Sequence, residues 1–169
     1  LIGNSAYAFG LMLAVFLVCL GVGAARAPAF AAKHGSAALA LGLSLASLSL
    51  ALSLPLWDQL PRFFVAAGKH VDSWAGRELC RAAAAFAILA VPTLFMGTTF
   101  PLLLARVAGR ESVAGEVAQL TVANTLGTIA GSLLTGYVVL PRLNSQDSLV
   151  AMTLLFALMA WLVLADARL

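Results

Sequence analysis

Charged side chains are scarce in this sequence. Only 10% of its 169 residues are Asp, Glu, Lys or Arg, whereas 62% are hydrophobic. A soluble domain carries roughly 25% charged residues, so the composition excludes a water-soluble fold. The net charge of +3 is too small and too scattered along the chain to predict a nucleic-acid partner. It fits contact with lipid headgroups better.

Residues that carry chemistry are equally few. Cys19 lies inside an apolar run and Cys80 at the mouth of another, without any CxxC pair, which disfavours a disulfide framework, structural zinc and c-type haem attachment. His34 and His70 fall in expected loops, where we expect them to be solvated, so no apolar run offers an imidazole ligand. No run carries an ionised residue well inside it, which disfavours a proton relay or an ion-coupled pump. Serine-elbow and phosphate-loop motifs are also absent. We therefore predict no catalytic residue, no cofactor and no metal site.

The remaining signal is a series of long apolar runs. About 20 apolar residues suffice to cross a bilayer, and the sequence predicts an all-α, multi-pass membrane bundle that forms a single domain over residues 1–169. The expected spans are 5–24, 36–56, 81–105, 118–140 and 148–165, with an interfacial segment at 58–79. The first run lacks the basic start and cleavage site of a signal peptide. Because the sequence begins with Leu1 rather than Met, we expect a fragment of a longer protein.

The second run has leucine at alternate positions, from Leu39 to Leu45 and again from Leu48 to Leu56. A period of two is a strand signal, so a transmembrane strand is an alternative. The run is about twice as long as the ~9–11 residues that a barrel strand needs. It also contains no β-branched residue, and Leu and Ala favour a helix. We therefore prefer a helix.

Residues 57–80 form the longest polar stretch. Its apolar residues recur at spacings of three or four, a pattern typical of a helix lying flat at the membrane interface. Gly68 weakens such a helix in the middle, so two short helices remain an alternative. We prefer a helix packed over the bundle to a gate or a ligand lid. The apolar residues are Leu60, Phe63, Phe64, Ala67, Val71 and Trp74.

Two prolines interrupt the third run. Pro92 and Pro101 cannot donate a backbone hydrogen bond, and each ring displaces the carbonyl four residues earlier. In lipid these carbonyls need other partners. A helix broken in this way indicates either a transport or ligand site or a structural kink, and we favour the kink. The candidate partners are the hydroxyls of Thr93, Thr98 and Thr99 or a neighbouring helix.

The fourth run carries small residues at every fourth position: Ala123, Gly127, Gly131 and Thr135. This spacing includes a GxxxG pattern and builds a flat face for helix packing. Asn124 lies close to the same face, and its amide cannot stay unpaired in hydrocarbon. It is expected either to clamp this helix onto the third span or to contact a polar substrate. We favour the clamp.

Three segments resemble a known family. They read PTLFMGTTFPLL at 92–103, ANTLGTIAGSLLTGYVVLPRL at 123–143 and NSAYAFGLMLAVFLVCLGVG at 4–23. Together they are similar to the membrane domain of bacterial spermidine-synthase-like proteins, in which a helical domain precedes a cytosolic aminopropyltransferase-like domain. The resemblance implies one more helix upstream and the synthase-like domain downstream. Neither is present in this sequence, so no catalytic role carries over to it.

The positive-inside rule does not decide the orientation, because five basic residues fall on each side of five spans. We prefer the side of the short, purely basic loop 26–35 as cytoplasmic, and the resemblance implies the bacterial inner membrane. Three functions compete. The first is a membrane domain that anchors an enzyme or passes a small cationic or amphipathic ligand. The second is an accessory subunit that packs with other membrane subunits or as a homo-oligomer. The third, a stand-alone transporter, is disfavoured because no span carries a charged residue well inside it.

Overall fold

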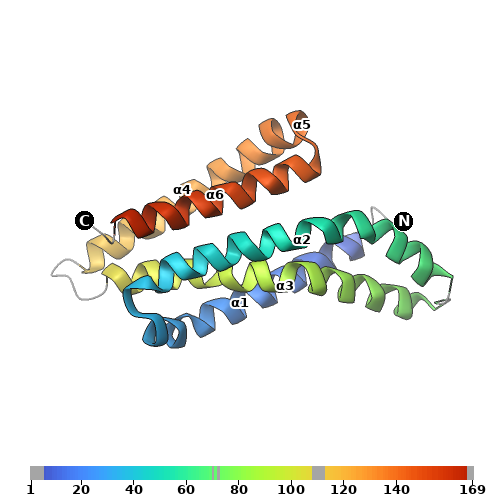
Figure 1. Ribbon diagram of the computed structural model, residues 1–169, viewed down its shortest axis with the longest axis horizontal. Helices are drawn as coiled ribbons and strands as arrows, with labels where there is room; N and C mark the ends of the chain where they lie inside the picture. The colour runs from blue at the N-terminus through green and yellow to red at the C-terminus, as the bar shows by residue number, and fades with distance from the viewer. Residues whose placement is uncertain (1–5, 70, 72, 108–112, 167–169) are drawn as a thin grey trace.

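The computed structural model describes residues 6–69, 71, 73–107 and 113–166, and within these ranges the chain is helical and contains no strand (Figure 1). His70, expected in a solvated loop, lies outside the described residues, as do Arg110 and Arg168, two of the basic residues counted for the orientation. The elements are α1 (Ala6–His34), η1 (Gly35–Ala37), α2 (Ala38–Gly68), α3 (Trp74–Val107), α4 (Val113–Leu134), η2 (Thr135–Val139, a π turn), α5 (Leu140–Arg142) and α6 (Ser145–Asp166).

Four continuous helical stretches in the described chain are long and apolar enough to cross a membrane: 7–68, 74–107, 114–142 and 145–166. The first stretch contains α1 and α2, which η1 joins in a tight reversal where Gly35 adopts a left-handed conformation with φ of +55°. A side chain is disfavoured at such a φ, which suits glycine. The all-helical prediction is confirmed, including the helix over 36–56, and the composition indicates a membrane protein.

A separate interfacial helix at 58–79 is not confirmed. α2 continues through Pro55 and Pro61 as far as Gly68, and α3 begins at Trp74. The apolar residues of 60–67 still share one side of a helix, but that side borders the hollows between α2 and α3. Their periodicity therefore reflects the packing of two long helices.

The predicted loop at 26–35 is also mostly helical. α1 extends to His34 with Pro28 inside it. His34 is half-buried rather than fully solvated, and its ring lies 4.6 Å from that of Phe30, measured between centroids.

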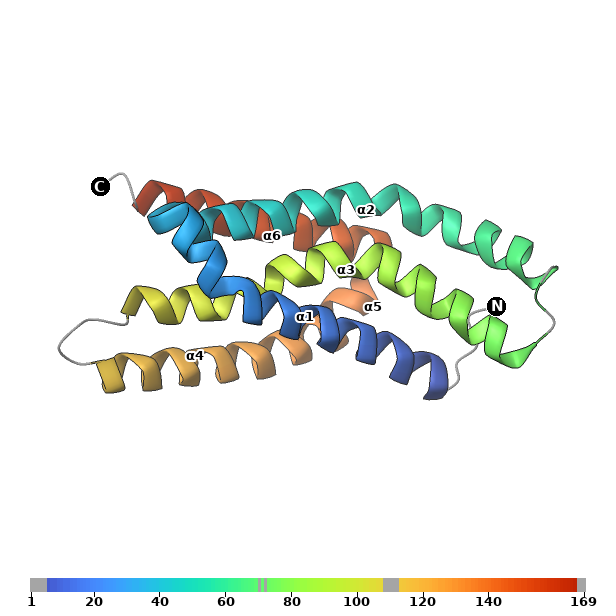
Figure 2. The same cartoon turned by 90° about the horizontal axis from the view of Figure 1, so that it is seen from below.

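α3 lies at the centre of the packed part of the molecule. α1 and α2 both pack against α3, and α6 packs against α2 (Figure 2). The core contains small residues beside a few leucines, which lets the helices approach closely. Its buried members are Ala27, Ala38, Leu39, Leu43, Leu102 and Ala160.

Two glycines form the closest contact between α1 and α3. A Cβ atom on Gly23 would lie 2.0 Å from the carbonyl oxygen of Leu94, and a Cβ on Gly97 would lie 2.2 Å from that of Leu20. The contact is reciprocal, because each glycine meets the backbone of the other helix. No side chain fits at either position without moving one of the helices.

Polar contacts hold two further elements in place. Ser47 Oγ on α2 donates to the carbonyl of Thr153 on α6 at 2.9 Å. Arg106 Nη2 near the end of α3 donates to the carbonyl of Ser36 in η1 at 2.8 Å. The first bond crosses the α2–α6 seam, and the second ties α3 to the reversal between α1 and α2.

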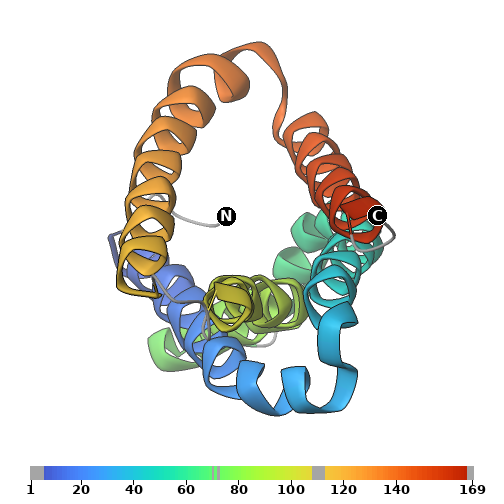
Figure 3. The same cartoon turned by 90° about the vertical axis from the view of Figure 1, so that its left-hand side faces the viewer.

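α4 stands apart from this packed group. Seen end-on, it leaves the bundle on the flank opposite α6, and the two helices spread apart and rejoin through α5 (Figure 3). Every residue of α4 from 121 to 134 is exposed. The molecule therefore has a packed part, formed by α1, α2, α3 and α6, and a helix, α4, whose residues 121–134 no described element covers.

Candidate functional site

The proline-containing part of α3 is a packing seam. Pro92, Thr93 and Thr98 are buried and Pro101 is half-buried. Thr98 Oγ1 donates to the carbonyl of Phe95 at 2.7 Å, so its partner is not the carbonyl that Pro101 frees. Thr99 Oγ1 is buried without a partner among the described residues. α3 stays helical across both prolines.

The second predicted set of residues lies on α4. Asn124, Gly127 and Gly131 are exposed, and a Cβ added to either glycine would meet nothing within 4 Å. The nearby hydroxyls of Thr125 and Thr128 bond the carbonyls four residues earlier in their own helix. No such bond joins the Asn124 amide to another described residue.

The structure thus separates the predicted residues into two groups. Pro92, Thr98 and their neighbours lie in the packed bundle, whereas Asn124 and its glycines lie on the uncovered helix. Asn124 is exposed, and no hydrogen bond between its amide and α3 is seen among the described residues. Both interpretations of Asn124, clamp and substrate contact, therefore require a partner outside the described chain.

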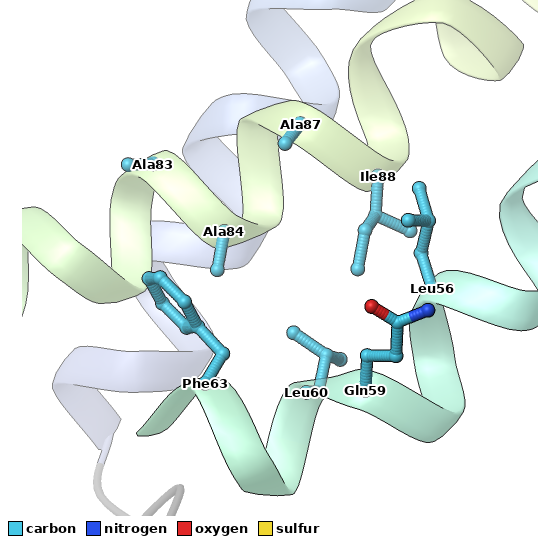
Figure 4. A pocket seen from close by; sticks show the side chains of 8 residues that line it. All are labelled: Leu56, Gln59, Leu60, Phe63, Ala83, Ala84, Ala87 and Ile88. Carbon is cyan, nitrogen blue, oxygen red and sulfur yellow. The ribbon is translucent and has the colours of Figure 1, made fainter. Parts of the chain in front are cut away.

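An apolar cleft between α2 and α3 did not emerge from the sequence. Its volume is about 380 Å³, and seven of its eight lining side chains are apolar, Gln59 being the exception (Figure 4). The apolar periodicity of 60–67 was the available signal, but it was assigned to the membrane surface. The lining residues are Leu56, Gln59, Leu60 and Phe63 of α2 with Ala83, Ala84, Ala87 and Ile88 of α3.

A second hollow of about 190 Å³ follows along the same two helices, towards their connection. Its lining includes Arg77, Cys80 and Arg81 of α3, and the only charges among its described lining residues are these two guanidinium groups. Arg81 Nη1 also pairs with Glu78 Oε1, one turn earlier on α3. The pair leaves the other guanidinium donors of Arg81 available, because an arginine has five.

A third hollow, of about 250 Å³, lies at the opposite end of the bundle beside η1. Its charged residue, Arg106, already donates to the Ser36 carbonyl. No group of three or more His, Cys, Asp or Glu residues converges in the described chain. The arrangement therefore offers apolar and cationic surfaces for binding.

Fold and composition together define the class: a helical membrane protein with at least four membrane-length helical stretches in its described residues. Comparison with protein-family models, with curated proteins and with solved structures gave no match for this chain. The similarity to spermidine-synthase-like membrane domains remains a prediction from residues 4–23, 92–103 and 123–143.

Proposed function

We propose that this chain is a non-catalytic, multi-pass membrane domain that anchors a larger assembly through lateral contact of α4. The observation that carries the proposal is the exposure of α4 over its whole 121–134 stretch, combined with an amide, Asn124, at the centre of an apolar segment. The larger assembly is the longer spermidine-synthase-like protein that the resemblance implies, a set of separate membrane subunits, or a homo-oligomer of this chain.

In this proposal the chain crosses the membrane five times, through α1, α2, α3, α4 and α6. The shortest of these helices has 22 residues, or about 33 Å at 1.5 Å per residue, and the hydrocarbon core is about 30 Å thick. The proposed location is the bacterial inner membrane.

The small-residue face of α4 supports a helix as its partner. In lipid, helices associate through close packing and interhelical hydrogen bonds, because lipid tails are as apolar as leucine. Asn124, Gly127 and Gly131 share this face, whereas Val122, Ile129 and Leu133 lie on the other side of the helix. A partner helix at the small face would allow close approach and would satisfy the Asn124 amide.

The test compares the two faces of α4 in the full chain reconstituted in lipid bilayers. Gly127→Leu and Gly131→Leu fill the small face without any clash inside the chain. We expect each variant to reduce association, measured by energy transfer between labelled chains, and to leave thermal unfolding unchanged. Ile129→Leu on the opposite face is the matched control and should associate as the wild type does.

Native complexes isolated from membranes distinguish the kinds of partner. A complex mass that is a multiple of the chain mass indicates a homo-oligomer, and an additional protein mass indicates a separate subunit. The proposal is wrong if no larger assembly forms, or if the Ile129 control weakens association as strongly as the glycine variants. Loss of binding of a small cationic ligand in Asn124→Leu, with assembly intact, would favour the passage function instead.

A further inference from the structure

The apolar cleft and the basic hollow follow each other along the same two helices, α2 and α3, and together they are called the α2–α3 groove. Phe63 lines the apolar cleft and Phe64 the basic hollow, and their ring centroids are 5.4 Å apart. On α3 the groove continues from Arg77 to Ile88, which corresponds to about 16 Å along a helix. That length is close to half of the ~30 Å hydrocarbon core, and hence to one leaflet.

The groove lies at the end of α2 and α3 that extends beyond the hydrocarbon core of the bilayer. α2 and α3 contain 31 and 34 residues, whereas a span needs about 20. Their polar residues, including Arg62, Arg77 and Arg81, are concentrated near the α2–α3 connection. The basic hollow therefore belongs at headgroup level, and the apolar cleft lies one to two turns deeper.

We propose that this groove binds one phospholipid with an anionic headgroup. Its phosphate lies between Arg77 and Arg81, and one acyl chain occupies the apolar cleft. Guanidinium groups bind phosphate oxygens through paired hydrogen bonds, and basic pockets between membrane helices are known sites for acidic lipid headgroups.

The acidic residues near the α2–α3 connection determine whether removing one of their charges should strengthen or weaken phosphate binding. Asp58, Asp72 and Glu78 lie in the same part of the sequence as four basic residues, Arg62, Lys69, Arg77 and Arg81. Among the described acids, Glu78 is ion-paired with the groove residue Arg81. Removing the Glu78 charge should therefore strengthen phosphate binding by freeing Arg81.

The experiment uses the delipidated full chain in a neutral detergent and measures lipid binding by native mass spectrometry. Dioleoyl phosphatidylglycerol and dioleoyl phosphatidylcholine have the same chains and differ in headgroup charge. We expect phosphatidylglycerol to bind at least about fivefold more tightly than phosphatidylcholine. This factor corresponds to the attraction between one surface arginine and an anionic lipid. Glycerol 3-phosphate, which has no chain, should not compete at lipid concentrations.

Headgroup variants test the basic end. Arg77→Gln should reduce the preference for the anionic lipid about fivefold, and Glu78→Gln should increase it. Arg62→Gln is the matched control, because Arg62 is exposed at the same end of the bundle but does not line the groove. Equal binding of the two lipids, or an equal loss in Arg62→Gln and Arg77→Gln, would overturn the proposal.

Substitutions in the apolar cleft test the proposed site of the acyl chain. Ala87→Leu places a larger side chain in the cleft from an exposed position, and should weaken both lipids by the same factor. Ala83→Leu, also exposed at the cleft, repeats the test if the first variant loses helicity by circular dichroism. Ala75→Leu, exposed outside the groove, is the control. Unchanged lipid binding in the folded cleft variants, or competition by glycerol 3-phosphate, would contradict the proposal. These variants leave α4 untouched, so the outcome is independent of the proposed assembly.

Discussion

Glycine has different surroundings at the α1–α3 crossing and on α4. At the α1–α3 crossing, Gly23 and Gly97 each face the backbone of the other helix at distances where no Cβ fits. On α4, Gly127 and Gly131 face open space within the chain. The crossing is a completed helix contact, whereas the α4 face has the composition of such a contact without its partner.

The difference shows that small residues predict close approach but do not identify the helix that approaches. The GxxxG pattern is the more conspicuous signal in the sequence, yet the contact that forms within the chain uses Gly23 and Gly97, which lie on different helices. Adding a side chain at the α1–α3 crossing should therefore destabilise the protein, whereas adding one to the small-residue face of α4 should not.

The largest effect is expected for Gly97→Ala. Its Cβ would lie 2.2 Å from the Leu20 carbonyl oxygen, so the helices must separate, at a cost of about 1–3 kcal/mol typical of overpacking. Unfolding of the purified chain in a denaturing-detergent titration measures the loss. Gly21→Ala, on α1 with nothing within 4 Å, is the control. Equal stability of the two variants would show that the α1–α3 contact is not as close as described.

A smaller effect is expected for Ser47→Ala, which removes the bond from α2 to the Thr153 carbonyl on α6. Interhelical hydrogen bonds in membrane proteins contribute about 0.6 kcal/mol on average, and we expect a loss of that order in the same titration. Ser49 bonds the Ala46 carbonyl of its own helix, so Ser49→Ala should change stability less. A larger loss of stability for Ser49→Ala than for Ser47→Ala would argue against the contact between α2 and α6.

The smallest effect is expected for Asn124→Leu. Because Asn124 is exposed and its amide forms no hydrogen bond to another described helix, the stability of the single chain should stay within about 0.5 kcal/mol of wild type. Thr128→Val, on the same helix, provides a comparison. A larger loss for Asn124→Leu alone would mean that the amide has a partner inside the chain, and the contrast between α4 and the packed bundle would fail.

The sequence was sufficient to predict the helical class, because Leu, Ala and the length of the hydrophobic runs decide it. The extension of α1 to His34 and of α2 to Gly68 was not predicted. Residues 26–35 were interpreted as a basic loop, and residues 58–79 as a separate interfacial segment.

The groove between α2 and α3 could not be predicted from periodicity alone. A helix that packs along one neighbour and a helix that lies flat on a membrane both place apolar residues such as Leu60, Phe63 and Ala67 at spacings of three and four. Which surface contacts these apolar residues depends on parts of the chain that are distant in sequence. Similarly, Asn124 required a partner on physical grounds, but the sequence could not specify whether the chain itself supplies it.

The bond from Ser47 to Thr153 joins residues 106 positions apart in the chain. A ribosome adds 5–20 residues per second, so Ser47 enters the membrane between about 5 and 20 seconds before its acceptor is made. During that interval the side of α2 that later contacts α6 faces lipid or an insertion factor, and the synthesis of α6 covers it. Truncation within α6 would therefore leave an otherwise inserted bundle with an open α2 surface.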